Sequence, residues 1–299
     1  MSLKSTNDRS IPLGLIAAQT GFRVLSSLAP GVAARAAARL FCKPRHHRRP
    51  AAEQESLDQA QPLSLRLGLR RLPAWRWGAE GAPSVLLVHG WEGRGSQLYS
   101  FVKPLLDRGF SVVTWDAPGH GDSPGRQSSL VEFADALWAA GRQAGDVHGV
   151  IAHSMGCAAT AIAFGEGLPV SRAAFVASPT SLGDYTHQFA ELVGLPESVR
   201  ARMVAGMERR FLVDFGDLDL RSVTLPDDVP LLIVHDADDK EVPSHHGQLI
   251  ADRWPGSQLV ITEGLGHRRV LRDPAVVSQI VNWMGSTPRP GGRAHASGS

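Results

Sequence analysis

Hydrophobic residues in this sequence recur as short uninterrupted runs that alternate with longer stretches of helical spacing. The runs lie at 84–88, 110–115, 147–152, 173–177, 230–234 and 258–261. Their length and continuity are typical of strands that are buried on both faces of a sheet. Helical spacing separates or follows them at about 96–108, 128–144, 155–166, 244–253 and 273–284. This alternation predicts an α/β fold with a mostly parallel central sheet, flanked by helices and joined by right-handed crossovers.

Two regions depart from this alternation. Leucines stand at every second position from 63 to 69, and a shorter alternating piece follows at 75–77. Together they predict an antiparallel hairpin at the edge of the sheet. Between 179 and 229 the spacing is helical throughout. Strand–helix connections usually run about 2–6 residues, so we predict a small helical cap at 180–229.

The two ends of the chain differ from its middle. Residues 1–45 read as two helical pieces broken at Ala29-Pro30-Gly31, and a polar linker follows at 45–50. We therefore expect a basic helical extension and linker over 1–60 and one main domain over 61–285, which carries the cap. The tail at 286–299 is rich in Pro, Gly and Ser, a composition that predicts disorder.

Positive charge is concentrated at the N-terminal end. Residues 1–50 carry nine Lys or Arg side chains and one Asp, whereas the formal charge of the whole chain is only +2. This segment is expected to be a solvated extension or an amphipathic surface in weak contact with an anionic membrane. Aromatic residues do not interleave with the charge, so no nucleic-acid partner is expected.

No apolar run approaches the roughly 18 residues that a membrane-spanning helix needs. A signal peptide around 11–18 is the less favoured alternative, because the apolar pattern continues well past it. We expect a cytoplasmic protein whose N-terminal segment can associate with membranes.

The run at 147–152 is followed by a turn of small residues and then by helix formers. Ser154 is at the apex of this strand–turn–helix. Such a turn strains the backbone of its central residue and needs small neighbours, and Ala152 and Gly156 meet that need. The serine hydroxyl would be exposed above the sheet, with the N–H of Met155 directed at the same space. The pattern A-x-S-x-G makes Ser154 the candidate nucleophile.

Ligands of an open parallel sheet bind beyond the carboxyl ends of its strands, so the residues after each run carry the candidate chemistry. A glycine-rich turn at 89–95 follows the first run. This turn can direct the N–H of Trp91 toward an oxygen beside Ser154. The N–H groups of Trp91 and Met155 would then form an oxyanion hole for acyl transfer. A phosphate-binding loop is disfavoured, because no Lys-Ser/Thr pair follows and the spacing fits neither glycine fingerprint.

Candidates for an acid and a base follow the last two runs. The loop at 235–243 contains three aspartates, any of which could orient a histidine: Asp236, Asp238 and Asp239. Spacing alone leaves the choice open. His267 lies on a glycine-flanked loop downstream of Ser154 and the aspartates, which is the chain order of a serine triad on an α/β sheet.

Other polar clusters are expected to be structural. Asp116 and His120 lie in a turn with two glycines and a proline, which favours a rigid turn with Asp116 bonded to backbone amides. The aspartate loop lacks EF-hand spacing and a central glycine, and no Cys or carboxylate cluster accompanies His46-His47. No metal is expected.

Over residues 63–285 the chain resembles the α/β-hydrolase fold superfamily, in particular serine hydrolases of the esterase and lipase type. The resemblance rests on His89-Gly90-Trp91, the turn at 116–123, the pentapeptide around Ser154, the loop at 235–243 and Gly266-His267. In that family the acid loop commonly reads H-G-x-x-D-x-x-V-P, which implies Asp239 as the catalytic acid, with Asp236 and Asp238 as runners-up. Ala152 replaces the first elbow glycine, and the His-Gly-Gly-Gly oxyanion form is absent.

These features predict a serine hydrolase that cleaves small-molecule carboxylic esters of modest chain length through an acyl-enzyme intermediate. Its expected residues are Ser154, Asp239 and His267, with the N–H groups of Trp91 and Met155 as the oxyanion hole. No metal or organic cofactor is required. Apolar cap side chains are the expected substrate lining, or else the cap's own core: Phe189, Leu192, Met203 and Met207. The alternatives are thioester, amide or lactone hydrolysis on the same triad, a ligand-sensing protein of low turnover, and lipid hydrolysis at a membrane surface aided by the basic N-terminus.

Overall fold

A computed structural model describes residues 13–223, 229–254 and 256–286, and these residues form two compact units. The sheet unit comprises Lys43–Ser181 and the residues from Gly216 onward. The helical unit comprises the residues up to Cys42 together with Leu182–Phe215. The predicted disordered tail lies outside the described residues from position 287 on. No helix in the described part of the chain is both long and apolar enough to cross a membrane.

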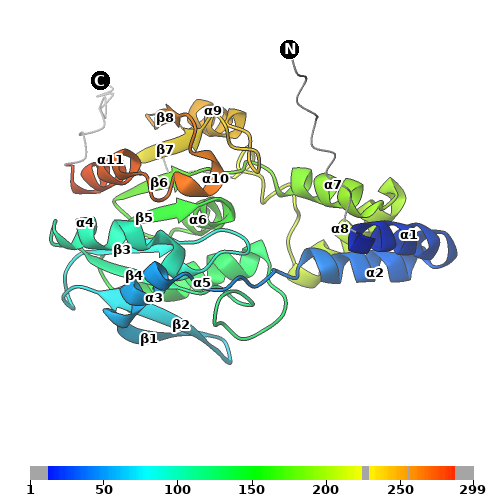
Figure 1. Cartoon of the computed structure of the whole chain (residues 1–299), viewed down its shortest axis with the longest axis horizontal. Coiled ribbons are helices and arrows are strands. Elements are labelled where there is room, and N and C mark those ends of the chain that lie inside the picture. Colours follow the sequence, from blue (N-terminus) through cyan, green and yellow to red (C-terminus); the bar gives the residue numbers. More distant parts are fainter. Residues whose placement is uncertain (1–12, 224–228, 255, 287–299) are drawn as a thin grey trace, which may run out of the picture. The chain divides into compact units, whose positions relative to one another are not determined.

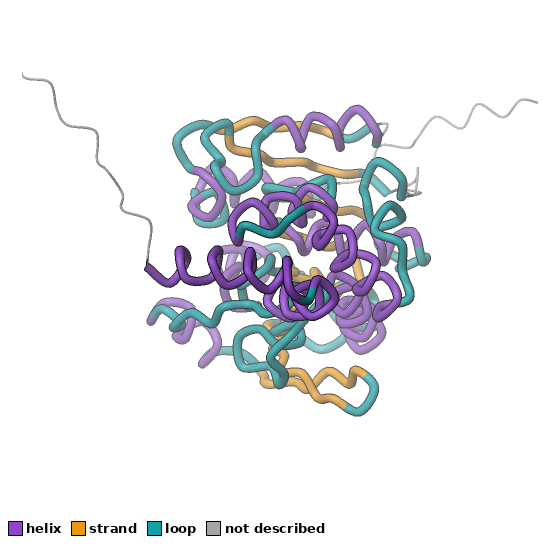
Figure 2. The backbone as a smooth tube through the Cα atoms, turned by 90° about the vertical axis from the view of Figure 1, so that its right-hand side faces the viewer, coloured by secondary structure: helices purple, strands orange, loops and turns teal. Residues whose placement is uncertain are grey.

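The described residues of the sheet unit form one eight-stranded sheet in the order β1-β2-β4-β3-β5-β6-β7-β8. The strands are β1 (Gln61–Leu67), β2 (Arg70–Trp77), β3 (Ser84–Val88), β4 (Ser111–Trp115), β5 (Val147–His153), β6 (Arg172–Val176), β7 (Leu231–Asp236) and β8 (Gln258–Thr262). Strands β3 to β8 pair in parallel, and the β1–β2 hairpin joins β4 antiparallel at one edge. In Figures 1 and 2 the sheet runs from this hairpin at the bottom to β8 at the top. The predicted α/β fold and its edge hairpin are confirmed.

Helices cover both faces of the sheet. They are α3 (Ala51–Asp58), the 3-10 helix η1 (Gly95–Phe101), α4 (Val102–Leu106), α5 (Leu130–Ala144), α6 (Met155–Gly165), α9 (His245–Arg253), α10 (Gly266–Arg269) and α11 (Pro274–Gly285). Helix α5 shows why such segments form where they do. Its cap Ser129 accepts the N–H of Glu132, and Gly145 follows it with a φ of 82°, so both ends carry the residues that helix termini favour.

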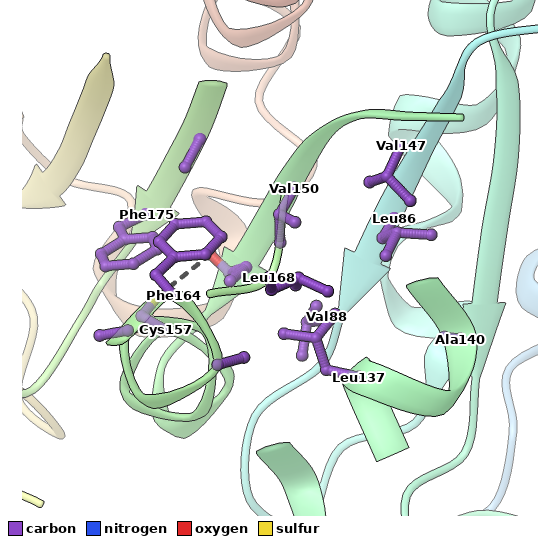
Figure 3. Close-up of a cluster of buried hydrophobic side chains, with 14 of the residues drawn as sticks. Leu86, Val88, Leu137, Ala140, Val147, Val150, Cys157, Phe164, Leu168 and Phe175 are labelled. Atoms are coloured by element: carbon purple, nitrogen blue, oxygen red, sulfur yellow. Dashed lines mark hydrogen bonds between the residues drawn. The ribbon is translucent and has the colours of Figure 1, made fainter. Parts of the chain in front are cut away.

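The core follows from the pleat of the central strands. Successive residues of β3 point to opposite faces, so Leu86 and Val88 pack with α5 and α6, whereas Leu87 packs with α4 and α11. Figure 3 shows the first of these clusters, where Leu137 and Phe164 cover the strands. Because both faces are covered, every residue of β3 is buried, and this is why the strand reads as a continuous apolar run.

The described part of the helical unit consists of four helices: α1 (Leu13–Leu28), α2 (Pro30–Phe41), α7 (Leu182–Val193) and α8 (Glu197–Phe211). Helix α2 presents a buried alanine face and packs against α8, whose buried residues recur at every fourth position. The Phe41 and Phe189 rings meet edge to face at 5.3 Å, and the Gln19 amide donates to the Leu192 carbonyl oxygen at 3.0 Å. This division differs from the predicted one, which separated an extension at 1–60 from a cap at 180–229. Helices of the two segments pack against each other, α2 with α8 and α1 with α7, so they belong to one unit.

The region predicted as extension and linker, 1–60, contains one further helix after the polar linker at 45–50. Helix α3 follows Pro50, and its buried residues are Glu53 and Leu57. Only one of these is apolar, so the sequence lacks the periodic hydrophobic signal that reveals a helix.

Candidate active site

Ser154 lies in the turn between β5 and α6. Its backbone has a φ of 53° and a ψ of −126°, a conformation that costs a non-glycine residue roughly 1–3 kcal/mol. The turn is fixed to the neighbouring strand, because the Ser154 N–H donates to the Val176 carbonyl oxygen at 2.9 Å. Within the described residues, the Ser154 side chain makes no capping hydrogen bond to α6. The hydroxyl is therefore not engaged by the helix that it precedes.

Two glycines allow the loop after β3 to lie directly on this turn. A Cβ at Gly156 would stand 2.6 Å from the His89 carbonyl oxygen, and a Cβ at Gly90 would stand 2.8 Å from the Ser154 Cβ. Both distances are shorter than real Cβ contacts, so both positions require glycine. Trp91 follows Gly90, and Met155 is the first residue of α6, where backbone N–H groups lack intrahelical partners. The structure thus brings the two predicted oxyanion residues to the Ser154 turn.

His267, on the short helix α10, is hydrogen-bonded to Asp239. Its Nδ1 lies 2.7 Å from Asp239 Oδ2, and both side chains are buried. Asp239 Oδ1 accepts the N–H groups of Glu241 and Val242 at 2.9 Å each. Burial acts to raise the pKa of Asp239, but the hydrogen bonds from His267 and the backbone outweigh it and lower that pKa overall. Asp239 is therefore held as a carboxylate against His267.

The other two aspartates of this loop bind backbone instead. Asp236 accepts the N–H groups of Asp238, Leu265 and Gly266 and the hydroxyl of Thr262. Asp238 accepts the N–H of Gly264 at 2.8 Å. Both carboxylates thus fix the loop that leads into His267, and within the described residues the imidazole is hydrogen-bonded to Asp239 instead. Of the three aspartates that spacing left open, this contact favours Asp239 as the acid.

His153 links the histidine loop to the serine turn. It precedes Ser154, and its Nε2 donates to the His267 carbonyl oxygen at 2.9 Å. The two imidazole rings lie 4.7 Å apart. Burial, reinforced by the nearby His267, lowers the pKa of His153 to about 3. His153 is therefore a neutral spacer between the two loops.

The turn after β4 has the structural role expected of it. Asp116 accepts the N–H groups of Gly95 and Asp122 at 2.8 Å each, and burial raises its pKa to about 6. The His120 ring packs edge-on against Trp91 at 4.9 Å. This turn therefore supports the loop after β3 from the side.

His89 fixes the start of that loop. Its Nε2 accepts the Ala117 N–H at 3.0 Å, so its Nδ1 donates to the Gly90 carbonyl oxygen at 2.7 Å. Burial lowers the pKa of His89 to about 3. The neutral imidazole thus satisfies both of its nitrogens.

Comparison with known proteins identifies the family. Residues 85–280 match the Alpha/beta hydrolase family, which is well over half of the chain. This chain belongs to the alpha/beta hydrolase family. A segment of 55 residues, 18% of the chain, is 44% identical to a pimeloyl-[acyl-carrier protein] methyl ester esterase from Aromatoleum aromaticum. That segment spans only 22% of the relative's length.

Solved structures share the fold of this hydrolase at low sequence identity. Carboxylesterase CesB from Bacillus subtilis has a TM-score of 0.54 and 19% identity, over 78% of this chain and 95% of that one. Naproxen esterase from Bacillus subtilis has a TM-score of 0.57 and 18% identity, over 79% and 96%. Bromoperoxidase from Bacillus anthracis has a TM-score of 0.55 and 16% identity, over 75% and 99%. At these identities the likeness shows the fold alone.

The predicted lining residues lie in the helical unit of this hydrolase. Met203 and Met207 are almost fully buried there, and the Met207 sulfur contacts the Cys42 thiol at 3.7 Å. Phe189 packs against Phe41, whereas Leu192 is 54% exposed. The two methionines thus occupy core positions, which was the alternative to a substrate lining.

Sequence reasoning missed several charged residues around the site. Arg45 binds the Glu92 carboxylate, and Arg94 forms a buried pair with Glu53. The signal is the run of Arg and His at 45–49, which on its own predicts a solvated linker. Among the described residues of this hydrolase, no group of three or more His, Cys, Asp or Glu could hold a metal ion.

Proposed function

We propose that the protein is a serine hydrolase that cleaves carboxylic esters through an acyl-enzyme intermediate. The observation that carries the proposal is the His267–Asp239 hydrogen bond, on a loop that His153 ties to the strained turn of Ser154. A nucleophile, a base and an acid that orients the base are what acyl transfer by serine requires.

In the proposed cycle, His267 Nε2 takes the Ser154 proton as Oγ attacks the ester carbonyl carbon. The oxyanion accepts hydrogen bonds from the N–H groups of Trp91 and Met155. His267 then returns the proton to the departing alkoxide, which leaves as the alcohol. Water repeats the sequence on the acyl-enzyme and releases the acid and free Ser154. Asp239 stabilises the imidazolium that forms in each half.

Substrates of modest chain length are the favoured class. The matched relative is named as an esterase of a methyl ester, which supports ester over amide chemistry. Of the predicted lining residues, the two methionines are buried in the core of the helical unit, so the expected chain-length preference does not rest on them. Thioester, amide and lactone hydrolysis use the same groups and are tested as alternatives, as is a sensor of low turnover.

The test is hydrolysis of p-nitrophenyl esters from acetate to laurate by the wild-type protein and by Ser154→Ala. Ser64→Ala, at an exposed position of β1, is the matched control. Activity abolished only in Ser154→Ala, with an optimum at short to medium chains, is the expected result. Equal rates in wild type and Ser154→Ala would contradict serine catalysis. Faster turnover of a thioester or lactone series would replace the ester assignment.

We also propose weak contact between the helical unit and anionic membrane surfaces. Residues 13–42 contain three Arg and no Asp or Glu. Exposed large apolar side chains of the described chain also concentrate in this unit, at Ile16, Val24, Leu28, Val32, Leu40, Leu192 and Leu212. Apolar side chains beside basic ones favour an anionic lipid interface.

Deleting the N-terminal helices would uncover the core face of α8, so point variants are the better test. A larger fraction of the wild-type protein should sediment with vesicles of phosphatidylglycerol and phosphatidylcholine than with vesicles of phosphatidylcholine alone. Val24→Gln with Leu28→Gln should weaken this binding, whereas Leu69→Gln, in the exposed β1–β2 turn, should not. The proposal would be refuted if the amount of bound protein were the same for both lipid compositions and for all variants. It would also be refuted if these residues instead mediated self-association of the protein.

A further inference from the structure

The turn that carries Trp91 has an unusual backbone for its sequence. It is closed by the Gly93 N–H, which donates to the Gly90 carbonyl oxygen at 3.0 Å. Its third residue, Glu92, has a φ of 57°. Glycine is the default residue in this left-handed region, because a side chain there is strained. A glutamate that directly follows Trp91 in this conformation must be stabilised by contacts elsewhere.

The hydrogen bonds come from Arg45, 47 positions earlier in the chain, and His47 Nε2 lies 3.8 Å from Glu92 Oε2 beside them. Arg45 Nε and Nη2 donate to the two Glu92 carboxylate oxygens at 2.8 Å each, and the Arg45 backbone N–H adds a bond of 3.2 Å. The Glu92 side chain is 13% exposed and that of Arg45 is 77% exposed, so the carboxylate is shielded from water whereas the guanidinium reaches it from the surface. Burial acts to raise the pKa of Glu92, but the hydrogen bonds and charge of Arg45 lower it overall. The carboxylate therefore stays charged and bound.

A second tie fixes the far end of the same loop. Arg94 binds Glu53 of α3 through two bonds of 2.6 and 2.9 Å. Glu53 is fully buried and also accepts from the Ser96 hydroxyl and from Arg272. His89 fixes the start of the loop, and the Trp91 ring packs against His120. Between Trp91 and the end anchored by Arg94, the backbone is held through Glu92.

We propose that Arg45 is a positioning residue for the oxyanion hole, which acts through Glu92 to hold the Trp91 N–H in its working orientation. The inference rests on the proposed serine-hydrolase function. It extends that function to a segment outside the matched family region, which begins at residue 85. An oxyanion donor stabilises the transition state more than the bound substrate, so its misplacement lowers kcat and leaves KM nearly unchanged.

The first comparison is Arg45→Ala against Arg70→Ala, with kcat normalised to the fraction of Ser154 that a fluorophosphonate titrates. Arg70 forms a similar pair with Glu132, at 2.7 Å, between β2 and α5. Loss of a whole oxyanion donor lowers kcat by about 10²–10³, so we expect a loss of about 10–100-fold in Arg45→Ala and none in Arg70→Ala. A trifluoromethyl ketone, which forms a tetrahedral adduct, should bind Arg45→Ala more weakly by a similar factor. Arg45→Lys should recover part of the activity.

The second comparison separates positioning from stability. Glu92→Gly removes the strained side chain, so Arg45→Ala should have little further effect in that background. Wild-type kcat and inhibitor affinity in Arg45→Ala would overturn the proposal, as would an equal loss in the Glu92→Gly background. If circular dichroism shows Arg45→Ala unfolded, Arg45→Lys and Glu92→Gln carry the same test, because each weakens the two-oxygen pairing. A wild-type protein that neither hydrolyses esters nor reacts with the fluorophosphonate would overturn the proposed function itself.

Discussion

Replacing Asp239 by asparagine tests the proposed triad, because the structure fixes how the new amide must be oriented. Asp239 Oδ1 accepts the N–H groups of Glu241 and Val242. An asparagine must therefore keep its oxygen on those two donors and turn its NH2 group toward His267 Nδ1, which lies 2.7 Å from the other oxygen. The imidazole then accepts at Nδ1 and carries its proton on Nε2. That is the nitrogen that has to receive the proton of Ser154.

A His267 that is protonated on Nε2 cannot act as the general base, although the hydrogen bonds of residue 239 are all kept. The equivalent change in a chymotrypsin-type triad lowers kcat by about 10⁴, so we expect a loss of about 10³–10⁴-fold in kcat for p-nitrophenyl butyrate. KM should stay within about threefold. The free energy of unfolding should fall by about 1–2 kcal/mol, because a charge-assisted hydrogen bond becomes a neutral one. Steady-state kinetics and urea unfolding measure both quantities.

Asp236→Asn is the matched control on the same loop. Asp236 accepts from four donors, and one amide oxygen cannot serve them all. We expect a loss of about 2–4 kcal/mol in the free energy of unfolding, with kcat of the folded protein reduced by less than about tenfold. If Asp239→Asn kept more than about a tenth of wild-type kcat while Asp236→Asn lost about 10³-fold, the assignment of the acid would be wrong.

Three further changes test the packing and the electrostatics. Met203→Ala should lower the free energy of unfolding by about 2–4 kcal/mol, since the side chain is 1% exposed; a large loss of kcat/KM without loss of stability would instead indicate a substrate contact. Gly90→Ala should lower kcat more than about 100-fold, because its Cβ would stand 2.8 Å from the Ser154 Cβ; wild-type kinetics would contradict this contact. His89 and His153 have pKa values lowered to about 3 in the folded protein, whereas an unfolded histidine titrates near 6.5. Stability should therefore fall as the pH drops below about 6.5, by about 2 kcal/mol per histidine at pH 5. The pKa of Asp116 is raised to about 6 in the folded protein, so its ionisation destabilises the fold at pH 7.5 and less so at pH 5. Asp116 therefore offsets about 1 kcal/mol of the loss from the histidines. A urea midpoint that is unchanged between pH 7.5 and 5 would refute this prediction.

The sequence was sufficient wherever a local pattern carries the information. Continuous apolar runs revealed the parallel strands, because burial on both faces leaves no polar position. The small residues around Ser154 revealed the turn, because only small side chains fit there. For Asp239, spacing was not enough and the family motif was needed, since the contact with His267 joins loops 28 residues apart.

The rest depends on contacts between distant segments. The spacing of Met203 and Met207 correctly indicated a buried helix face, but it could not show what covers that face. Met207 meets Cys42, 165 positions earlier, so the N-terminal helices could not be assigned to the same unit from either segment alone. The charge run around Arg45 predicts a solvated segment, because a run of charges does not indicate which residues it will pair with. Its partner Glu92 lies in a different motif.

Two buried carboxylates explain how loops from different strands keep a fixed geometry at the carboxyl ends of the parallel strands. Asp116 follows β4 and binds the backbone of the loop after β3, and Asp236 ends β7 and binds the backbone of the loop after β8. Each carboxylate thus fixes the loop of the neighbouring strand in the sheet. The positions of Trp91 and His267 therefore depend on strand order and register as well as on the sequence of their own loops. Groups fixed in this way need little reorganisation during a reaction. In the loop after β3, Asp116 binds the backbone of Gly95, four residues after Trp91. Glu92, the residue directly after Trp91, is bound by Arg45 instead. For this reason we expect the single residue Arg45 to affect kcat.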